Sequence, residues 1–241
     1  MAGDQEAPSE DSHQRAHGSA ATSVWLREEV PSRSRRTLTR EGIVVEAVGL
    51  LDDQGIGRMT MRRLAERIGV TSTALYWHVK TKEEVLDLAF DHVFGFVEIP
   101  RADGDWRSDV RALLLGWRKT MLDHPWTTAL VGRPMLGPNV LARTEYLYST
   151  LAGTGLSGIE LSAITQLFAN YVIGTAAAES TWHQAETAPE QQALAWQRIE
   201  DNRDVYPTLY QSGHFDEQRA SSDELFEHGL DMLITRVVDT A

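Results

Sequence analysis

The sequence predicts an all-α protein, and three observations support this fold class. Apolar residues recur every three or four positions through most of the chain, which is the spacing that gives a helix one buried face. No segment sustains the alternation of apolar and polar residues that is typical of strands. The 18 glycines and 8 prolines cluster at intervals, where they bound segments of helical length. A chain of 241 residues has room for more than one helical unit.

The composition restricts the kinds of site, cellular location and partner that we expect for this protein. The chain has no cysteine, which excludes disulfides and thiolate-based zinc sites. It shows no long uncharged apolar run, so we expect no transmembrane helix, no signal peptide, no membrane partner and a cytoplasmic location. The net charge of −12 argues against a nucleic-acid partner, but residues 32–82 hold ten Lys or Arg against five Asp or Glu. A basic module carried by an acidic body would be oriented toward DNA.

Residues 1–37 are predicted to be a disordered N-terminal extension, because they are rich in Ser, Gln, Glu, Gly and Ala. The end of this extension is a basic arm with Arg33, Arg35 and Arg36. A flexible arm of this kind could enter the minor groove beside a DNA site. A solvated basic tail that makes only unspecific phosphate contacts explains the same residues equally well.

Residues 38–97 are predicted to form a domain with a three-helix helix-turn-helix core. The first helix runs from about Thr39 to Gly55 and supports the next two. The second runs from its cap at Thr60 to Gly69, where the chain must turn sharply, and the third is capped by Thr71 or Ser72. The positions expected to face inward are Ile43, Val44, Ala47, Val48 and Leu51 in the first helix, Met61, Leu64, Ala65 and Ile68 in the second, and Ala74, Leu75 and Val79 in the third.

The third helix is expected to read DNA. Its inward face is thin, which leaves an exposed cluster around Tyr76 and Trp77 to be explained. In a helix-turn-helix the second helix of the motif lies in the major groove, where short hydroxyl side chains reach base edges and other side chains grip phosphates. A packed helical hairpin with an aromatic patch is the alternative. The predicted base contacts are Arg62, Thr71, Ser72, Thr73 and Tyr76, and the predicted phosphate contacts are Thr60, Trp77, His78, Lys80 and Lys82.

The residues of this motif also carry a family resemblance. The run TMRRLAERI at positions 60–68, followed by GVTSTALYWHVKTKEEVLD at 69–87, resembles the DNA-binding domain of the tetracycline-repressor (TetR) family. The resemblance implies a transcriptional repressor whose partner is a double-stranded DNA operator. On a looser match, it also implies that residues 98–241 form a helical effector-binding and dimerisation domain.

Beyond the reading helix, capping boxes and breakers predict the remaining helices. Thr81 and Glu84 open a helix that is expected to run to Pro100 with Phe96 among its inward residues, and this helix is the covalent bridge to the body. Further helices are expected at 106–123, 138–151 and 158–182, followed by one or two short ones in a polar segment. The last helix begins with a capping box of Ser221 and Glu224, and its expected apolar face is Leu225, Phe226, Leu230, Leu233, Ile234 and Val237.

A homodimer is expected for two reasons. One reading helix recognises too few bases for genomic specificity, so two half-sites in a palindrome are needed. The resemblance implies that the helix at 158–182 and the last helix of each subunit form a four-helix interface. Gly174 and the run 176–178 of alanines would let backbones approach there, although packing within one subunit explains them nearly as well.

The body carries more aromatic residues than packing needs, which suggests a site for a small-molecule effector. The effector would be flat and largely apolar or aromatic, such as an antibiotic or a related metabolite controlling an efflux or biosynthetic gene. The family's tetracycline-contacting histidine has no counterpart in Gly95–Glu98, so chelated magnesium–tetracycline is not implied. Each candidate taken alone is also explained as core. The candidates are Trp117, Met121, His124, Trp126, Gln166, Phe168, Asn170, Tyr171 and Trp182.

Two other functions stay open. An enzyme is disfavoured, because the sequence has no zincin histidine pair, no glycine-rich phosphate loop and no nucleophile elbow. No cofactor and no metal are expected, although His183 and His214 with Asp201 or Asp204 would allow a metal site. A constitutive DNA-binding dimer without an effector is the other alternative, and the aromatic excess argues mildly against it.

Overall fold

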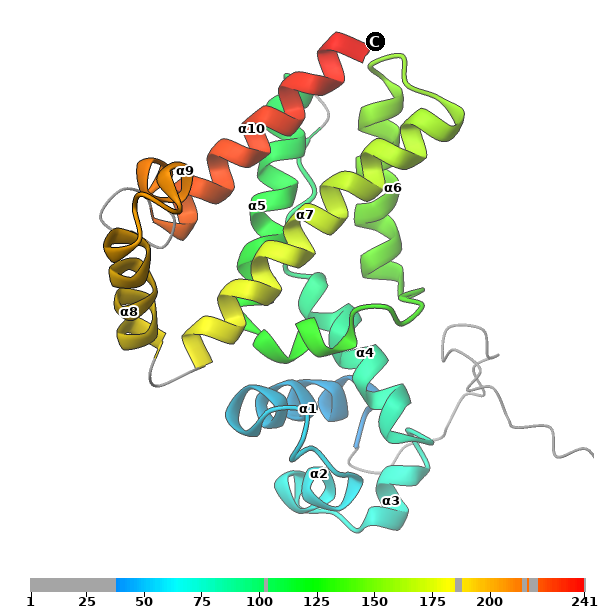
Figure 1. Ribbon diagram of the computed structural model, residues 1–241. Helices are drawn as coiled ribbons and strands as arrows, with labels where there is room; N and C mark the ends of the chain where they lie inside the picture. Colours follow the sequence, from blue (N-terminus) through cyan, green and yellow to red (C-terminus); the bar gives the residue numbers. More distant parts are fainter. Residues whose placement is uncertain (1–37, 102–103, 185–187, 214–215, 217–220, 241) are drawn as a thin grey trace, which may run out of the picture.

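The computed structural model describes residues 38–101, 104–184, 188–213, 216 and 221–240 (Figure 1). Within these residues the regular elements are all helices, which confirms the predicted fold class. The basic arm of Arg33, Arg35 and Arg36 lies outside the described residues, so its position in a minor groove stays a prediction. In chain order the helices are α1 (Arg40–Gln54), α2 (Met61–Ile68), α3 (Ser72–Tyr76), α4 (Lys82–Phe94), α5 (Trp106–Asp123), the 3₁₀ helix η2 (Pro125–Leu130), α6 (Pro138–Ala152), α7 (Gly158–Gln184), α8 (Ala188–Asp201), α9 (Pro207–Ser212) and α10 (Ser222–Thr240).

Helices α1, α2 and α3 form the N-terminal module at the predicted positions. Each begins after a threonine, Thr39, Thr60 or Thr71, whose hydroxyl oxygen accepts a backbone N–H of the first turn. Gly55 and Gly69 end α1 and α2 with φ angles of 73° and 77°, a region that a residue without Cβ enters at little cost. The apolar positions predicted to face inward in α1 are all buried.

Helix α4 leads from the module to the body but ends earlier than predicted. The helix was expected to reach Pro100, whereas it stops at Gly95, and Phe96, expected to face inward, is 65 % exposed. The reason is a side chain of α6: Arg143 donates to the carbonyls of Gly95 and Val97 at 2.6 and 2.8 Å. These bonds satisfy carbonyls at the end of α4, so the chain can leave the helix there.

The body is built around α7, which contacts α5, α6, α10 and η2. In Figure 1, α7 crosses in front of α5 with α10 beside it, while α8 and α9 lie at the edge of the body. Residues 158–181 are long and apolar enough, by composition alone, to cross a membrane. In the fold, Phe168, Val172 and Ala176 are buried inside the subunit, whereas Ile159 and Leu167 are 85 % and 48 % exposed. Packing within the chain therefore accounts for the apolar residues on one face of α7, whereas those on the other face are exposed to solvent.

The small residues of α7 divide between these two faces. Ala176 is fully buried, so it serves packing within the subunit. Gly174 and Ala178 are exposed, and a Cβ added at Gly174 would meet no atom within 4 Å. Packing within the chain therefore explains Ala176, and the role of Gly174 and Ala178 in an interface stays a prediction.

Helix α10 begins with the predicted capping box. The backbone N–H of Glu224 donates to the Ser221 hydroxyl at 3.2 Å, and the Glu224 carboxylate accepts the Ser221 N–H at 2.8 Å. The Ser221 N–H and hydroxyl both donate to the Glu224 carboxylate, and these two bonds lower the pKa of Glu224 below its usual value. Leu225, expected to face inward, is 63 % exposed, because the face that packs on α7 is centred one position later, at Phe226.

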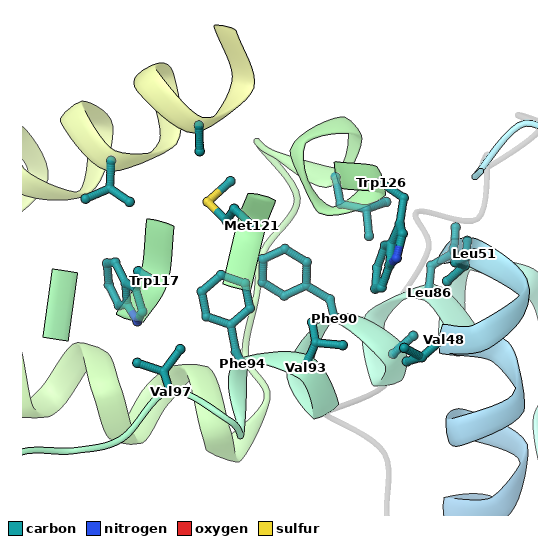
Figure 2. Close-up of a cluster of buried hydrophobic side chains, with 14 of the residues drawn as sticks. Val48, Leu51, Leu86, Phe90, Val93, Phe94, Val97, Trp117, Met121 and Trp126 are labelled. Atoms are coloured by element: carbon teal, nitrogen blue, oxygen red, sulfur yellow. The ribbon is translucent and has the colours of Figure 1, made fainter. Parts of the chain in front are cut away.

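The core runs without interruption from the module into the body. Figure 2 shows Phe90 and Phe94 of α4 between Trp117 and Met121 of α5 on one side and Trp126 of η2 on the other. The rings of Phe90 and Phe94 stack at 4.5 Å, and Phe94 meets Trp117 edge-on at 6.1 Å. Because α4 supplies aromatic rings to this shared core, a shift of the body against α4 must repack them.

Candidate DNA-reading surface and effector region

The turn between α2 and α3 has the geometry of a tight helix-turn-helix. Gly69 adopts a left-handed conformation, and its N–H and that of Val70 donate to carbonyls at the end of α2 at 3.2 and 3.0 Å. Leu75 and Val79 are fully buried, so α3 is anchored by the inward residues that the sequence predicts. Ala74, also expected inward, is only partly buried.

The opposite side of α3 is open to solvent. Trp77 is 75 % exposed and Tyr76 is 45 % exposed, while Thr71 and Thr73 are exposed beside them. Large exposed aromatic side chains at the tip of a module indicate a binding surface, because water solvates them poorly. Of the predicted contact residues in this segment, Thr71, Thr73, Tyr76 and Trp77 are exposed, whereas Ser72 and His78 are half-buried. Their assignment to bases or phosphates stays a prediction.

The corner between α3 and α4 is organised by Glu84. The Thr81 hydroxyl accepts the Glu84 N–H at 3.0 Å, which is the first half of the predicted capping box. The reciprocal bond differs: the Glu84 carboxylate accepts the N–H of Lys80 at 3.0 Å and that of the Arg40 guanidinium at 2.8 Å. Glu84 is only 5 % exposed. It therefore fixes the end of the reading helix to both α4 and α1, a role that local spacing does not show.

Three of the predicted cationic contacts are already engaged within the module. The Lys82 ammonium donates to the carbonyl of Ile56 at 3.2 Å, and that of Lys80 donates to the carbonyl of Tyr76 at 3.1 Å. Arg62 pairs with Glu66 at 2.8 Å, and this hydrogen bond raises the pKa of the guanidinium. Both partners of that pair are largely exposed, so the pair is weak and can exchange for a DNA contact.

Several predicted effector contacts are core residues in this structure. Trp117, Met121 and Phe168 are at most 7 % exposed and pack between α4, α5 and α7. The indole N–H of Trp117 is buried without a hydrogen-bond partner. Such a donor is costly to leave unpaired and would gain from a ligand oxygen.

The remaining effector candidates are dispersed. Gln166 and Asn170 lie on the exposed face of α7, away from Phe168. Tyr171 stacks on Phe226 at 5.3 Å and donates its hydroxyl to the carbonyl of Phe226 at 3.1 Å, so it joins α7 to α10. The side chain of Trp182 lies outside the described residues, as do those of His183 and His214 from the possible metal site. The structure does not bring the whole predicted set around one cavity.

His124 and Trp126 face the N-terminal module. The Trp126 Nε1 atom is 2.7 Å from Oδ1 of Asp52 in α1, and the His124 Nδ1 atom is 2.8 Å from the same oxygen. Figure 2 places the Trp126 ring beside Leu51 of α1 and Leu86 of α4. These two candidates therefore connect η2 to the N-terminal module, which sequence spacing could not reveal.

The end of α4 and the start of α6 satisfy each other's backbone groups. Asp91 of α4 accepts the N–H of Val140 and the side-chain amide of Asn139, both at 2.9 Å. Arg143 of α6 binds the carbonyls after α4, as described above. Burial raises the pKa of Asp91 and lowers that of Arg143. The Asp91 carboxylate also occupies the space that a Cβ at position 137 would fill, which explains Gly137.

In the part of the chain that the structure describes, neither the cavity on the module nor a metal cluster suggests another site. A cavity of about 370 Å³ on the module is lined by Leu50, Gln54, Arg63, Glu66 and Arg67. Its charged groups are already engaged, since Arg63 and Arg67 bond to side chains of α1 and Glu66 bonds to Arg62. Among the residues that the structure describes, no three His, Asp or Glu side chains are grouped as metal ligands.

Comparisons with known proteins agree with this architecture. Residues 43–89 match the family of bacterial regulatory proteins called tetR, and residues 100–237 match the tetracyclin repressor-like C-terminal domain. An HTH-type transcriptional regulator of Saccharopolyspora erythraea is 41 % identical over 224 residues, which cover 92 % of this chain and 94 % of that protein. The transcriptional repressor DrrR1 of Streptomyces coeruleorubidus is 32 % identical over 167 residues, covering 68 % of this chain and 62 % of the repressor.

Solved structures show the same fold over most of the chain. ActR of Streptomyces coelicolor, in complex with actinorhodin, superposes with a TM-score of 0.76 at 28 % identity and covers 85 % of this chain and 97 % of its own. A helix-turn-helix module joined by α4 to a helical body defines a DNA-binding transcriptional regulator. Within that class, the chain belongs to the TetR family of bacterial regulators.

Proposed function

We propose that the protein is a homodimeric repressor that occupies a palindromic operator in the cytoplasm and leaves it when a small apolar or aromatic molecule enters the body. The observation that carries the proposal is the outward surface of α3, where Trp77 and Tyr76 are exposed beside the threonines of the turn. Glu84 holds this surface at a fixed angle to α4. A rigid, exposed helix of this kind suits the major groove.

The homodimer is supported by the outward faces of α7 and α10. Leu167 of α7 and Met232 of α10 are 48 % and 62 % exposed, and the two helices contact each other within the subunit. Exposed apolar side chains on neighbouring helices indicate an interface. A second copy that covers them would form a four-helix contact and place two α3 helices on one DNA duplex.

The effector is supported by the relatives and by the shared core. ActR is known in complex with actinorhodin and with (S)-DNPA, so a relative of this fold takes such ligands. In this chain Phe94 packs edge-on against the buried Trp117, whose indole N–H has no hydrogen-bond partner. An effector that displaced part of this packing would move α4, because α4 contributes Phe90 and Phe94 to it.

The DNA-binding part is tested by measuring binding of the purified protein to a fluorescent library of short palindromic duplexes, with a salt series on the best duplex. Sequence-selective binding by two protomers with a steep salt dependence supports the proposal. Weak, sequence-blind binding at every salt concentration contradicts it.

The effector part is tested with that duplex as the probe. Polycyclic aromatic antibiotics and simple planar aromatics are screened for release of the duplex, and quenching of tryptophan emission reports binding in the body. A constitutive DNA-binding dimer would keep the duplex with every compound and show no saturable quenching.

A further inference from the structure

We propose that Asp52 is a positioning residue that sets the orientation of the DNA-binding module on the body, and hence the half-site spacing that the dimer accepts. One oxygen of this α1 carboxylate lies within 2.8 Å of two nitrogen donors, Nε1 of Trp126 and Nδ1 of His124, at the start of η2. The inference rests on the proposed function, since spacing matters only to a dimer on two half-sites.

Asp52 belongs to a module whose parts are tied together. Its neighbour Asp53 and Glu46, both on α1, bind Arg67 of α2 at 2.6 and 3.0 Å. The Arg40–Glu84 pair joins the start of α1 to α4. A displacement of α1 at Asp52 therefore carries α2 and α3 with it.

The donors belong to the body. Helix η2 contacts α5 and α7, and Trp126 is only 5 % exposed. Thr127 is fully buried and donates its hydroxyl to the carbonyl of His124 at 2.8 Å, which holds the start of η2 in place. If Asp52 moved away, the buried indole N–H of Trp126 would lose its acceptor. Such unpaired donors are unfavourable, so the contact resists rotation of the module.

Two attachments define an orientation that one attachment leaves free. The first is α4, which is fixed to α6 at its far end by Asp91 and Arg143 and is also bound at Asp87 by Arg133, at 2.6 Å. The second is the contact of Asp52 with η2, on a different helix of the module. In a two-fold symmetric dimer a rotation of each module changes the distance between the two α3 helices, and half-sites about 34 Å apart tolerate little change.

The experiment compares two kinds of DNA. One is a duplex with a single half-site, and the others are palindromes whose spacer is shortened or lengthened by one or two base pairs around the preferred length. Affinity is measured by fluorescence anisotropy for the full-length wild-type protein and for the variants D52L, D52N and W126F. The matched control is D53N, which removes the same charge one residue away, where the partner Arg67 lies inside the module.

D52L and W126F are expected to reduce the ratio of affinities between the preferred and the neighbouring spacers by about fivefold or more. Their affinity for the single half-site should stay within about twofold of wild type, because α3 itself is unchanged. D52N retains an oxygen that accepts the Trp126 N–H, so it should keep most of the spacing preference. D53N should keep nearly all of it, because Glu46 of α1 still binds Arg67.

A wild-type spacing profile in both D52L and W126F would overturn the inference. Equal losses on single half-sites and palindromes would overturn it too, since they would show damage within the module. If D52L does not fold, as judged by thermal unfolding, W126F decides alone. Failure of the proposed function looks different, because the wild-type protein would then prefer no palindrome at any spacing.

Discussion

The tip of α3 and the junction of α4, α5 and η2 are both rich in aromatic residues, but they place them in opposite environments. Trp77 is 75 % exposed, whereas Trp117 and Trp126 are 7 % and 5 % exposed. The exposed indole contributes little to folding and is available to a partner. The buried ones hold the module and the body together. The same residue type thus lies on the proposed DNA-binding surface in one region and in the packing between module and body in the other.

The largest expected effect tests this division directly. W117A should lower the free energy of unfolding by about 3–5 kcal/mol, because it leaves a cavity beside Phe94 in the shared core. W77A should change it by at most about 0.5 kcal/mol and instead weaken operator binding. Urea unfolding at fixed protein concentration measures the first quantity and anisotropy the second. Equal destabilisation by the two variants would contradict the division.

The reading surface can be divided further by replacing Thr73. T73A should cost about 1–3 kcal/mol of discrimination at one base position in each half-site, because a hydroxyl contact to a base edge is lost. Binding to random DNA should hardly change. The measurement is a set of operator variants with single base changes. An equal loss of affinity on all DNA sequences would show that Thr73 contacts a phosphate and not a base.

Lys82 should behave in the opposite way. K82A should weaken binding on specific and random DNA alike and reduce the slope of log affinity against log salt by about 0.9 per subunit, if the ammonium exchanges its bond to the Ile56 carbonyl for a phosphate. K119A, which changes an exposed lysine of α5, is the matched control. An unchanged salt slope in K82A would mean that the side chain serves only the Ile56 contact.

The smallest expected effect concerns pH and the buried end of α4. Because burial raises the pKa of Asp91, the folded protein keeps this proton at a pH where the unfolded chain has lost it. The stabilisation from this proton is full below the ordinary aspartate pKa of about 3.9 and disappears as pH rises through the raised value.

The matched comparison for this effect is D91N, whose amide does not titrate. The free energy of unfolding of the wild type, relative to D91N, should therefore fall as pH rises from about 4. E83Q, at an exposed position of α4, should show no such trend against wild type. A constant difference between wild type and D91N across this range would show that Asp91 is not shielded from solvent.

The sequence predicts the N-terminal module better than the body, because the residues that fix the helix ends of the module act through local contacts. Thr60, Gly69 and Thr71 fix helix ends through bonds within a few residues, so spacing alone locates them. The early end of α4 depends on Arg143, which lies more than 40 positions away in the sequence. No local pattern contains that contact, and Phe96 was wrongly expected to be buried.

The effector candidates show a second limit of prediction from sequence. An aromatic count cannot distinguish a side chain that lines a ligand site from one that fills a core, and it cannot show which helix Trp126 faces. Gln166 and Asn170 of α7 are four positions apart, so the sequence places them on one face of the helix. It does not show whether that face points into the body or toward solvent. Periodicity places residues on a face but does not identify the neighbour.

The mutual capping of α4 and α6 restricts how this regulator can be recombined with its relatives. A chimera cut at Val97, between the predicted domains, would separate Asp91 from Gly137 and remove Arg143 from the carbonyls that it binds. A foreign body with a bulkier residue at position 137 would collide with the carboxylate. Grafts that exchange operator recognition should therefore transplant the segment 38–81 with Arg40 and Asp52 retained, and leave α4 with its native body.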